Sequence, residues 1–423
     1  MVEIIVRPSQ KQWPQLLQRP YHDNRVVRSA VQQVLEAVKK SGDGAVQYFN
    51  AQWGGYGGSL LVNEEEWKKG AAAIEPSLQK AIDDAAANIR RFHEQQVLPV
   101  EKIETAPGII CWRESRPIQK LGIYIPGGTA PLFSTVLMLG VPAQIAGCSE
   151  VVLCTPPDAG GVIHPAIYYA AKLCGVTKMV KAGGAQAIAA LAYGTQSVPQ
   201  VYKIFGPGNQ YVTAAKQMVQ LEGVAIDMPA GPSEVCVIAD DTADVRFVAA
   251  DLLSQAEHGP DSQVLLVTDS EAFARQCREE VYQQIEALPR KKAAASAMGN
   301  SKILVVNSLQ EAVQVSNEYA PEHLILNCGN AEELLPQVIN AGSVFMGAYT
   351  PESLGDYASG TNHTLPTNGA ARAYSGVSVD SFVKKITVQK ATVFGLRNIS
   401  ETVITMAEAE GLQAHAEAVR IRM

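Results

Sequence analysis

The segment GIYIPGGTAPLFSTVLML (residues 122–139) joins a short apolar run to an apolar stretch of helical length through two glycines. A buried strand that passes through a glycine turn straight into a buried helix is typical of a parallel α/β sheet. Residues 121–149 carry no charged side chain, but Pro126, Gly127 and Pro142 interrupt them, which argues against a membrane-spanning helix. The segment therefore predicts a buried strand, a turn and a buried helix in a soluble protein.

Similar apolar runs recur along the chain and alternate with Ala-rich stretches of helical spacing. The candidate strands are residues 122–126, 151–155, 179–183 and 203–207 in a first set, and 234–240, 263–268, 302–307, 323–327 and 343–347 in a second. Strands that alternate with helices predict parallel sheets covered on both faces. With a split near residues 231–233, the fold class is α/β, with two doubly wound, Rossmann-like parallel-sheet domains.

The two ends of the chain differ from this pattern. Residues 1–105 are polar and helix-rich, with helical spacing over Val26–Phe49 and Pro76–Val97. After about residue 380 the strands are expected to stop. Ser400 is the candidate cap of a helix that ends before Gly411, and a short helix follows. This small helical tail has too little apolar surface for its own core, so it must pack on its own body or on a partner subunit.

Composition excludes several classes of protein. Of 423 residues, 47% are hydrophobic and 18% charged, which argues against a disordered chain. The net charge of −7, without any basic block, argues against nucleic-acid binding. Seven scattered cysteines suit a reducing compartment better than a disulfide framework. Glu3 and Arg7 interrupt any signal peptide, so we expect a cytoplasmic protein without a membrane segment.

Three candidate strands of the first set end in glycine and run into a helix. These turns contain Gly127 and Gly128, Gly183 and Gly184, and Gly206 and Gly208. Glycine lets a ligand approach the backbone, and a helix N-terminus favours anions. In one parallel sheet all three turns lie at the same edge, so they favour a dinucleotide or phosphate ligand. Glycine can also simply make a tight turn, and the usual GxGxxG pattern is absent.

Polar residues of the second half suggest a metal site. Gln255 and His258 share one face in the last turn of a predicted helix, where the helix dipole favours a cation. Further candidates are Glu322 and His323 beside a strand, Asp356 and His363 in a polar loop, and Glu410 and His415 in the tail. Imidazole and carboxylate ligands suit Zn²⁺, but these segments are distant in sequence, and each residue could equally be a cap or a loop side chain.

A catalytic cysteine is the rival interpretation, because a thiolate can attack an aldehyde and hold a covalent intermediate. Cys148, Cys154 and Cys174 lie in apolar runs, where inert buried thiols are expected. Cys111 and Cys328 are less clearly buried from sequence alone.

Seven motifs together closely resemble the histidinol dehydrogenase family. They are LGIYIPGGTAPLFSTVLM, GGAQAIAALA, KIFGPGNQYV, IDMPAGPSEV, LLSQAEHGPDSQ, YAPEHL and GDYASGTNHTLPT. The resemblance is strong over residues 120–370 and weaker up to the tail helix. It implies an NAD-dependent, zinc-dependent oxidoreductase of histidine biosynthesis that is a cytoplasmic homodimer.

The resemblance also implies site residues. The ligands of Zn²⁺ would be Gln255, His258, Asp356 and His415, and the catalytic acid/base pair would be Glu322 and His323. The residues that contact NAD would be Tyr124, Gln186 and Asn209. L-Histidinol would be surrounded by the metal ligands and His323, together with Ser233, His363 and Glu410. The implied domains are residues 1–20 as an N-terminal segment, 21–123 plus 235–378 with the metal and catalytic residues, 124–234 with the NAD site, and 379–423 as a tail exchanged between subunits.

The implied reaction consists of two hydride transfers, from L-histidinol through L-histidinal to L-histidine. An imidazole such as His323 titrates near working pH and can remove the hydroxyl proton, while Glu322 can activate the water that adds to the aldehyde. Neighbours in a strand point to opposite faces, so we expect the pair to lie in the turn after Pro321 rather than in the strand.

Three alternatives remain open from the sequence. A related zinc-dependent dehydrogenase of the same fold could act on another small alcohol. A zinc hydrolase could use the same ligands, but it would leave the glycine turns unexplained. A non-catalytic binding protein could keep the pocket, although it would have no need of Glu322 and His323.

Overall fold

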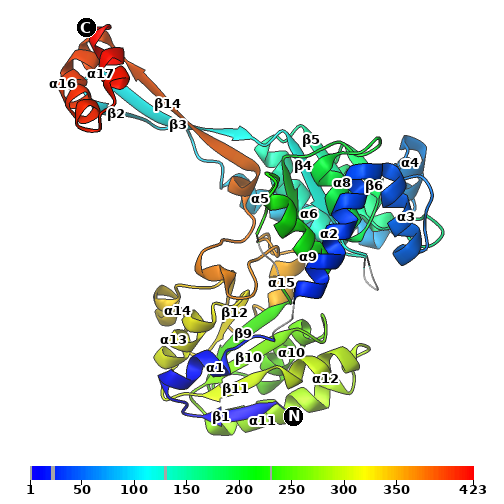
Figure 1. Cartoon of the computed structure of the whole chain (residues 1–423). Helices are drawn as coiled ribbons and strands as arrows, with labels where there is room; N and C mark the ends of the chain where they lie inside the picture. The colour runs from blue at the N-terminus through cyan, green and yellow to red at the C-terminus, as the bar shows by residue number, and fades with distance from the viewer. Residues whose placement is uncertain (1, 21–23, 128–130, 229–230) are drawn as a thin grey trace.

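The computed structural model describes residues 2–20, 24–127, 131–228 and 231–423. It contains two α/β bodies, each built on a parallel sheet, and an arm that carries the C-terminus away from both (Figure 1). Within these ranges no helix is long and apolar enough to cross a membrane. Gly128, predicted to belong to the first glycine turn, lies outside the described residues.

The first body is built on a six-stranded parallel sheet. Its order is β1 (Glu3–Val6), β11 (Lys302–Val305), β10 (Gln263–Thr268), β9 (Glu234–Ala239), β12 (His323–Asn327) and β13 (Ser343–Met346). Every residue of β9, β10 and β12 is buried, because helices cover both faces. This two-sided burial is why these strands are continuous apolar runs in the sequence.

Helices cover this sheet in two layers. One face packs against α10 (Val245–Ala256), α11 (Glu271–Ile285) and α12 (Lys291–Gly299). The other packs against α1 (Trp13–Leu16), α13 (Leu309–Tyr319) and α14 (Ala331–Leu334). The N-terminal residues thus belong to this body: β1 extends its sheet, and Trp13 and Leu17 are buried against it.

The second body is built on a five-stranded parallel sheet. Its order is β6 (Lys178–Lys181), β5 (Glu150–Thr155), β4 (Lys120–Tyr124), β7 (Lys203–Phe205) and β8 (Ala225–Ile226). One face packs against α4 (Glu64–Ala72), α5 (Pro76–Glu94), α6 (Phe133–Ala146) and α7 (Pro165–Leu173). The other packs against α2 (Asn24–Ser41), α3 (Asp43–Gly54), α8 (Gly184–Tyr193) and α9 (Gln210–Gln220). The two doubly wound α/β units predicted from the sequence are confirmed.

The packing of α2 to α5 differs from the predicted grouping of residues 21–123 with 235–378. These helices share their cores with the five-stranded sheet, not with the six-stranded one. An amphipathic pattern reveals that a helix has an apolar face, but not which of two sheets that face covers. The remaining domain boundaries stay a prediction.

The C-terminal region corrects two predictions. The strands do not stop near residue 380, because β14 (Val383–Ala391) pairs antiparallel with β3 (Ile109–Pro117), which pairs with β2 (Lys102–Ala106). This ribbon leads to α16 (Val393–Ala409) and α17 (Gln413–Arg420), at the tip of the arm (Figure 1). Thr392, not Ser400, caps α16: its hydroxyl accepts from the Gly395 N–H, whereas Ser400 lies inside the helix. The predicted helix end before Gly411 is confirmed.

Candidate active site

The candidate catalytic residues lie at the amino edge of the six-stranded sheet. His323 is the first residue of β12 and pairs in register with Val235 and Ser343, while Glu322 immediately precedes the strand. The prediction that the pair lies outside the strand is therefore wrong for His323. The two side chains still approach each other, with His323 Nδ1 3.6 Å from Glu322 Oε2. Both are buried.

One residue of the neighbouring strand holds both side chains. The Glu234 N–H donates to Glu322 Oε2 at 3.0 Å, and the Glu234 carbonyl accepts from His323 Nδ1 at 3.1 Å. Because a carbonyl only accepts, the proton of a neutral His323 sits on Nδ1, and Nε2 carries the lone pair. Nε2 faces Asp356 Oδ1 at 3.5 Å and has no hydrogen-bond partner.

Burial and nearby carboxylates shift the titration of this pair. Burial raises the pKa of Glu322 to about 8, against the opposing charge of His323 and the hydrogen bond from Glu234. Burial alone would lower the pKa of His323, but the surrounding carboxylates of Glu322, Asp356 and Glu352 raise it to about 10, above the working-pH range expected from the sequence. The two groups titrate as a coupled pair that retains a proton at neutral pH. Strongly shifted, buried acid/base groups of this kind are typical of active sites.

Two of the four predicted metal ligands, His258 and Asp356, lie near His323, and Gln255 interacts with Glu352 beside them. Gln255 lies in the last turn of α10, His258 follows the helix, and Asp356 lies in α15 (Glu352–Tyr357). Burial lowers the pKa of His258, while the charge of Asp356 opposes this, which favours the neutral imidazole that metals bind. Burial would raise the pKa of Asp356, but the nearby imidazoles of His323, His363 and His258 lower it.

The donor atoms of Gln255, His258 and Asp356 are of kinds that bind a divalent metal ion, and their role as ligands stays a prediction. Gln255 is 1% exposed, and its buried Oε1 has no hydrogen-bond partner. This oxygen can therefore accept a hydrogen bond from a ligand or coordinate a cation. An amide oxygen, a neutral imidazole and a carboxylate form a donor set that suits Zn²⁺. The described part of the chain contains no group of three or more His, Cys, Asp or Glu side chains able to hold a metal ion.

The tail residues do not join this site within one chain. His415 lies in α17 and Glu410 just after α16, both exposed at the tip of the arm (Figure 1). Ser233 and His363 do lie near the site. Ser233 directly precedes Glu234, and His363 Nδ1 donates to the Asp356 carbonyl at 2.8 Å.

The glycine turns lie at the carboxyl edge of the five-stranded sheet, as predicted. Gly127, Gly183 and Gly206 follow β4, β6 and β7, which run parallel in one sheet. The start of α6, beyond the first turn, reaches the other body: Thr135 Oγ1 lies 3.0 Å from His363 Nε2, and Asn362 Nδ2 donates to the Met138 carbonyl at 2.5 Å. The carboxyl edge of one sheet thus faces the polar loop of the other body.

The three predicted NAD contacts each make hydrogen bonds within the chain. The Tyr124 hydroxyl accepts from the Gly184 N–H at 3.0 Å, and burial raises the pKa of Tyr124 to about 12. Gln186 Nε2 donates to Asn50 Oδ1 at 3.0 Å, while its buried Oε1 has no partner. The Asn209 side chain caps α9 by accepting from two backbone N–H groups. Their role in cofactor binding stays a prediction.

The close approach of β4 and β7 makes Gly206 hard to replace. Its φ is +128°, and an added Cβ would lie 2.0 Å from the Tyr124 carbonyl oxygen. We expect Gly206→Ala to lower the stability by about 1–3 kcal/mol, because backbone strain and a backbone clash combine. Gly223→Ala is the control: Gly223 has φ +97° but open space around it. Thermal unfolding of both variants checks this, and equal losses would mean that the clash relaxes without cost.

Three residues in and around the candidate site, Glu352, Asp227 and Lys216, were not predicted from the sequence, and only Glu352 had a local signal. Glu352 is buried one helical turn before Asp356, accepts from Ser254 Oγ at 2.5 Å, and burial raises its pKa to about 7. Its spacing of four from Asp356 could have suggested a shared face. Asp227 accepts from the Gly206 N–H at 2.8 Å and pairs with the buried Lys216, and nothing in their local patterns indicates this.

The cysteine alternative finds no support in the thiol environments. No cysteine forms a disulfide. Burial raises the pKa of Cys328 to about 11, together with the charges of Asp240 and Asp269, so its nucleophilic thiolate is disfavoured. Burial likewise raises the pKa of Cys148 to about 11.

Comparisons with known proteins agree with the resemblance in the motifs. A histidinol dehydrogenase family model matches residues 17–423. A histidinol dehydrogenase of Bacteroides thetaiotaomicron is 55% identical over 424 residues, which cover 100% of this chain and 99% of that protein. One of Vibrio vulnificus is 51% identical over 98% of this chain and 96% of that protein. The crystal structure of histidinol dehydrogenase from Elizabethkingia anophelis has a TM-score of 0.97 and 52% identity, over 100% of this chain and 98% of that one. The chain is therefore an oxidoreductase that belongs to the histidinol dehydrogenase family.

Proposed function

We propose that this enzyme oxidises L-histidinol to L-histidine in two NAD-dependent steps, with L-histidinal held in the site between them. The balanced reaction, with L-histidinol entering as its ammonium cation and L-histidine leaving as the zwitterion, is L-histidinol⁺ + 2 NAD⁺ + H₂O → L-histidine + 2 NADH + 3 H⁺. The observation that carries the proposal is the buried Glu322–His323 pair, held by one residue of β9 beside Asp356. The reaction belongs to histidine biosynthesis, for which we propose a cytoplasmic location.

His323 would act as the base in both oxidations. Its Nδ1 is anchored to the Glu234 carbonyl, so in the neutral imidazole, which the raised pKa of about 10 makes the minor form at neutral pH, Nε2 can take the proton of the substrate hydroxyl. After the first oxidation the aldehyde must add water before a second hydride can leave. Glu322, 3.6 Å from the imidazole, is placed to take a proton from that water.

Gln255, His258 and Asp356 would hold Zn²⁺, with His415 of a second copy as the fourth ligand. Bound Zn²⁺ would orient the amino and imidazole groups of the substrate and polarise its reacting oxygen. Ser233, His363 and Glu410 would complete the substrate pocket beside these ligands and His323. The free Gln255 Oε1 and the lowered pKa values of His258 and Asp356 support this set.

NAD would bind at the glycine turns of the five-stranded sheet. Tyr124, Gln186 and Asn209 lie at or just beyond the carboxyl ends of its strands, where helix N-termini offer free N–H groups. The contacts of Thr135 with His363 and of Asn362 with Met138 bring this edge toward the loop of Asp356. This arrangement lets a nicotinamide approach the substrate from the opposite body.

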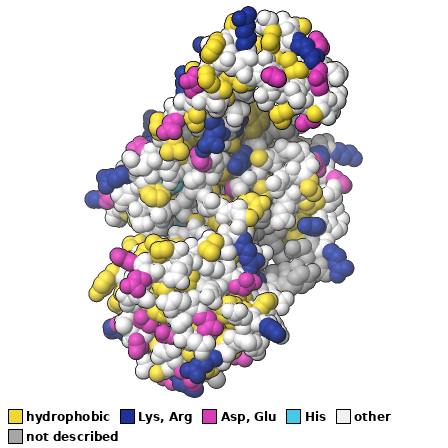
Figure 2. Space-filling view, turned by 90° about the vertical axis from the view of Figure 1, so that its left-hand side faces the viewer, with side chains coloured by type: hydrophobic (Ala, Val, Ile, Leu, Met, Phe, Trp, Pro, Cys, Tyr) yellow, Lys and Arg dark blue, Asp and Glu magenta, His cyan; other side chains and the backbone are white. Residues whose placement is uncertain are grey.

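We propose a homodimer in which the tails are exchanged. Large apolar side chains cover the arm and its tip: Ile103, Ile386, Val393, Phe394, Met406 and Ile421 are each at least 45% exposed. Figure 2 shows hydrophobic side chains spread over the projecting lobe. Many exposed apolar side chains on a lobe that has no core of its own are typical of a subunit interface.

A count of NADH formed per L-histidinol consumed tests the proposal. We expect two NADH, a loss of turnover with a chelator and recovery on addition of Zn²⁺. One NADH per substrate would mean that the aldehyde escapes and that the role of Glu322 is wrong. No NADH from L-histidinol, but turnover of another small alcohol, would reassign the substrate.

A further inference from the structure

Arg19, from the N-terminal segment, forms a two-pronged ion pair with Glu234. Its Nε donates to Glu234 Oε1 at 2.5 Å and its Nη2 to Oε2 at 2.8 Å. The Glu234 side chain is 3% exposed and that of Arg19 is 16% exposed, so solvent screens this pair little. These two parallel hydrogen bonds, called the fork below, fix the orientation of the Glu234 carboxylate, and the guanidinium balances its negative charge.

Glu234 connects this ion pair to the catalytic residues. Its own N–H and carbonyl are the groups that hold Glu322 and His323. Its carboxylate also accepts from the Asn368 N–H at 2.8 Å. A shift of Glu234 in β9 would therefore move both catalytic side chains together.

Arg19 also holds the turn that leads into the catalytic pair. Its Nη2 donates to the carbonyls of Tyr319 at 2.8 Å and Ala320 at 3.4 Å. Ala320 has φ +52°, an uncommon conformation for a residue with a side chain, and only Pro321 separates it from Glu322. The guanidinium therefore contacts the segment before Glu322 as well as the strand beside it.

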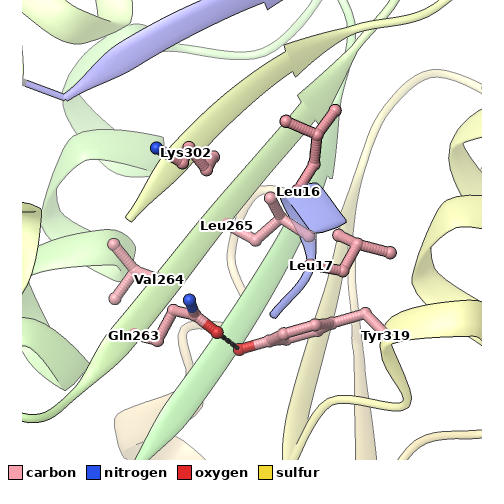
Figure 3. A pocket seen from close by; sticks show the side chains of 7 residues that line it. All are labelled: Leu16, Leu17, Gln263, Val264, Leu265, Lys302 and Tyr319. Atoms are coloured by element: carbon pink, nitrogen blue, oxygen red, sulfur yellow. Dashed lines mark hydrogen bonds between the residues drawn. The ribbon is translucent and has the colours of Figure 1, made fainter. Parts of the chain in front are cut away.

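The N-terminal segment keeps Arg19 in place. The guanidinium lies 4.1 Å from the centre of the Tyr319 ring. The Tyr319 hydroxyl donates to Gln263 Oε1 at 2.9 Å, as the dashed line in Figure 3 marks. Gln263 Nε2 in turn donates to the Gln18 carbonyl at 3.1 Å, beside Arg19. Leu16 and Leu17 lie over the same strands (Figure 3), and the shallow hollow that they line with Gln263 and Tyr319 has no room for a ligand.

We propose that Arg19 is a positioning residue for the oxidation: it fixes Glu234 and the Tyr319–Ala320 turn, and thereby places Glu322 and His323 against the substrate. The inference rests on the proposed function of that pair. It gives the N-terminal segment a role in turnover beyond packing. A misplacement of reacting groups by about 1 Å can reduce a rate by about 10²-fold, so loss of the fork should reduce kcat by about 10- to 100-fold.

The test compares Arg19→Met and Arg19→Lys with Leu17→Ala. Leu17 is a buried residue of the same segment, and its apolar side chain packs in the adjacent core and cannot hydrogen-bond to Glu234, so its truncation should loosen the segment and leave the fork intact. For each variant, kcat and KM on L-histidinol, the melting temperature and the zinc content are measured. Arg19→Lys keeps the charge without the fork, so it should fold even if Arg19→Met does not.

We expect kcat to decrease in the order wild type, Arg19→Lys, Arg19→Met, with KM and zinc content nearly unchanged. Leu17→Ala should lose melting temperature but keep kcat within about twofold of wild type. If Leu17→Ala loses as much kcat as Arg19→Met at equal loss of melting temperature, or if both Arg19 variants keep wild-type kcat, the positioning role is wrong. Wild-type protein that makes no NADH from L-histidinol would instead reject the proposed function, so the two failures are distinguishable.

Discussion

His323→Asn is expected to slow the oxidation of both L-histidinol and L-histidinal by about 10²- to 10⁴-fold, the usual contribution of a general base. Asparagine keeps a donor that can reach the Glu234 carbonyl, so the strand pairing of β12 should persist. What it removes is the imidazole Nε2, which faces Asp356 Oδ1 at 3.5 Å and has no hydrogen-bond partner. Because the same base serves both hydride transfers, both rates should decrease.

Glu322→Gln is expected to reduce the rates of the two oxidations unequally. The amide keeps an oxygen that can accept from the Glu234 N–H, but it cannot take a proton from water. The loss should therefore be larger on L-histidinal than on L-histidinol, since only the aldehyde step needs added water. Each variant is assayed on each substrate, with Glu333→Gln on the exposed face of α14 as the control. Equal losses on the two substrates would reject the assignment of Glu322.

The sequence predicted the sheets well because their strands are buried on both faces. All nine predicted strands are present, and runs such as QVLLVT (residues 263–268) are fully buried. The strands that the sequence analysis missed are short edge strands or the ribbon of β2, β3 and β14. In β14, VKKITVQKA, no residue is buried, so no apolar run marks it.

The site could be predicted only in part, for a different physical reason. The motifs indicated candidate side chains for the chemistry, and the structure brings His258, Asp356 and His323 together, with Gln255 beside Glu352. The residues that hold these side chains in position come from segments that are distant in the sequence. Arg19 and Glu234 are 215 positions apart, and neither lies in a pattern that indicates an ion pair. Such contacts follow from the packing of the whole body, not from local spacing.

The exposed tail provides a second prediction with a large effect. His415→Asn should lose zinc and nearly all turnover, and so should His258→Asn, because each removes one of four ligands. Within one chain His415 lies at the tip of the arm, away from Gln255, whose Oε1 is free. If the tails are exchanged, each site combines the body of one subunit with the tail of the other.

Mixed dimers of the two inactive variants decide whether the tails are exchanged. In such a dimer, the body of the His415→Asn subunit meets the intact tail of the His258→Asn subunit, so one site has all four ligands and the other lacks two. We expect about one zinc ion and one working site per mixed dimer. Mixing His258→Asn with Gln255→Ala is the control, because both changes lie in the body and no combination restores a complete site. Recovery in the first mixture alone would establish the exchange. No recovery would mean that each tail serves its own subunit, and the arm would then have to fold back toward α10 rather than project as in Figure 1.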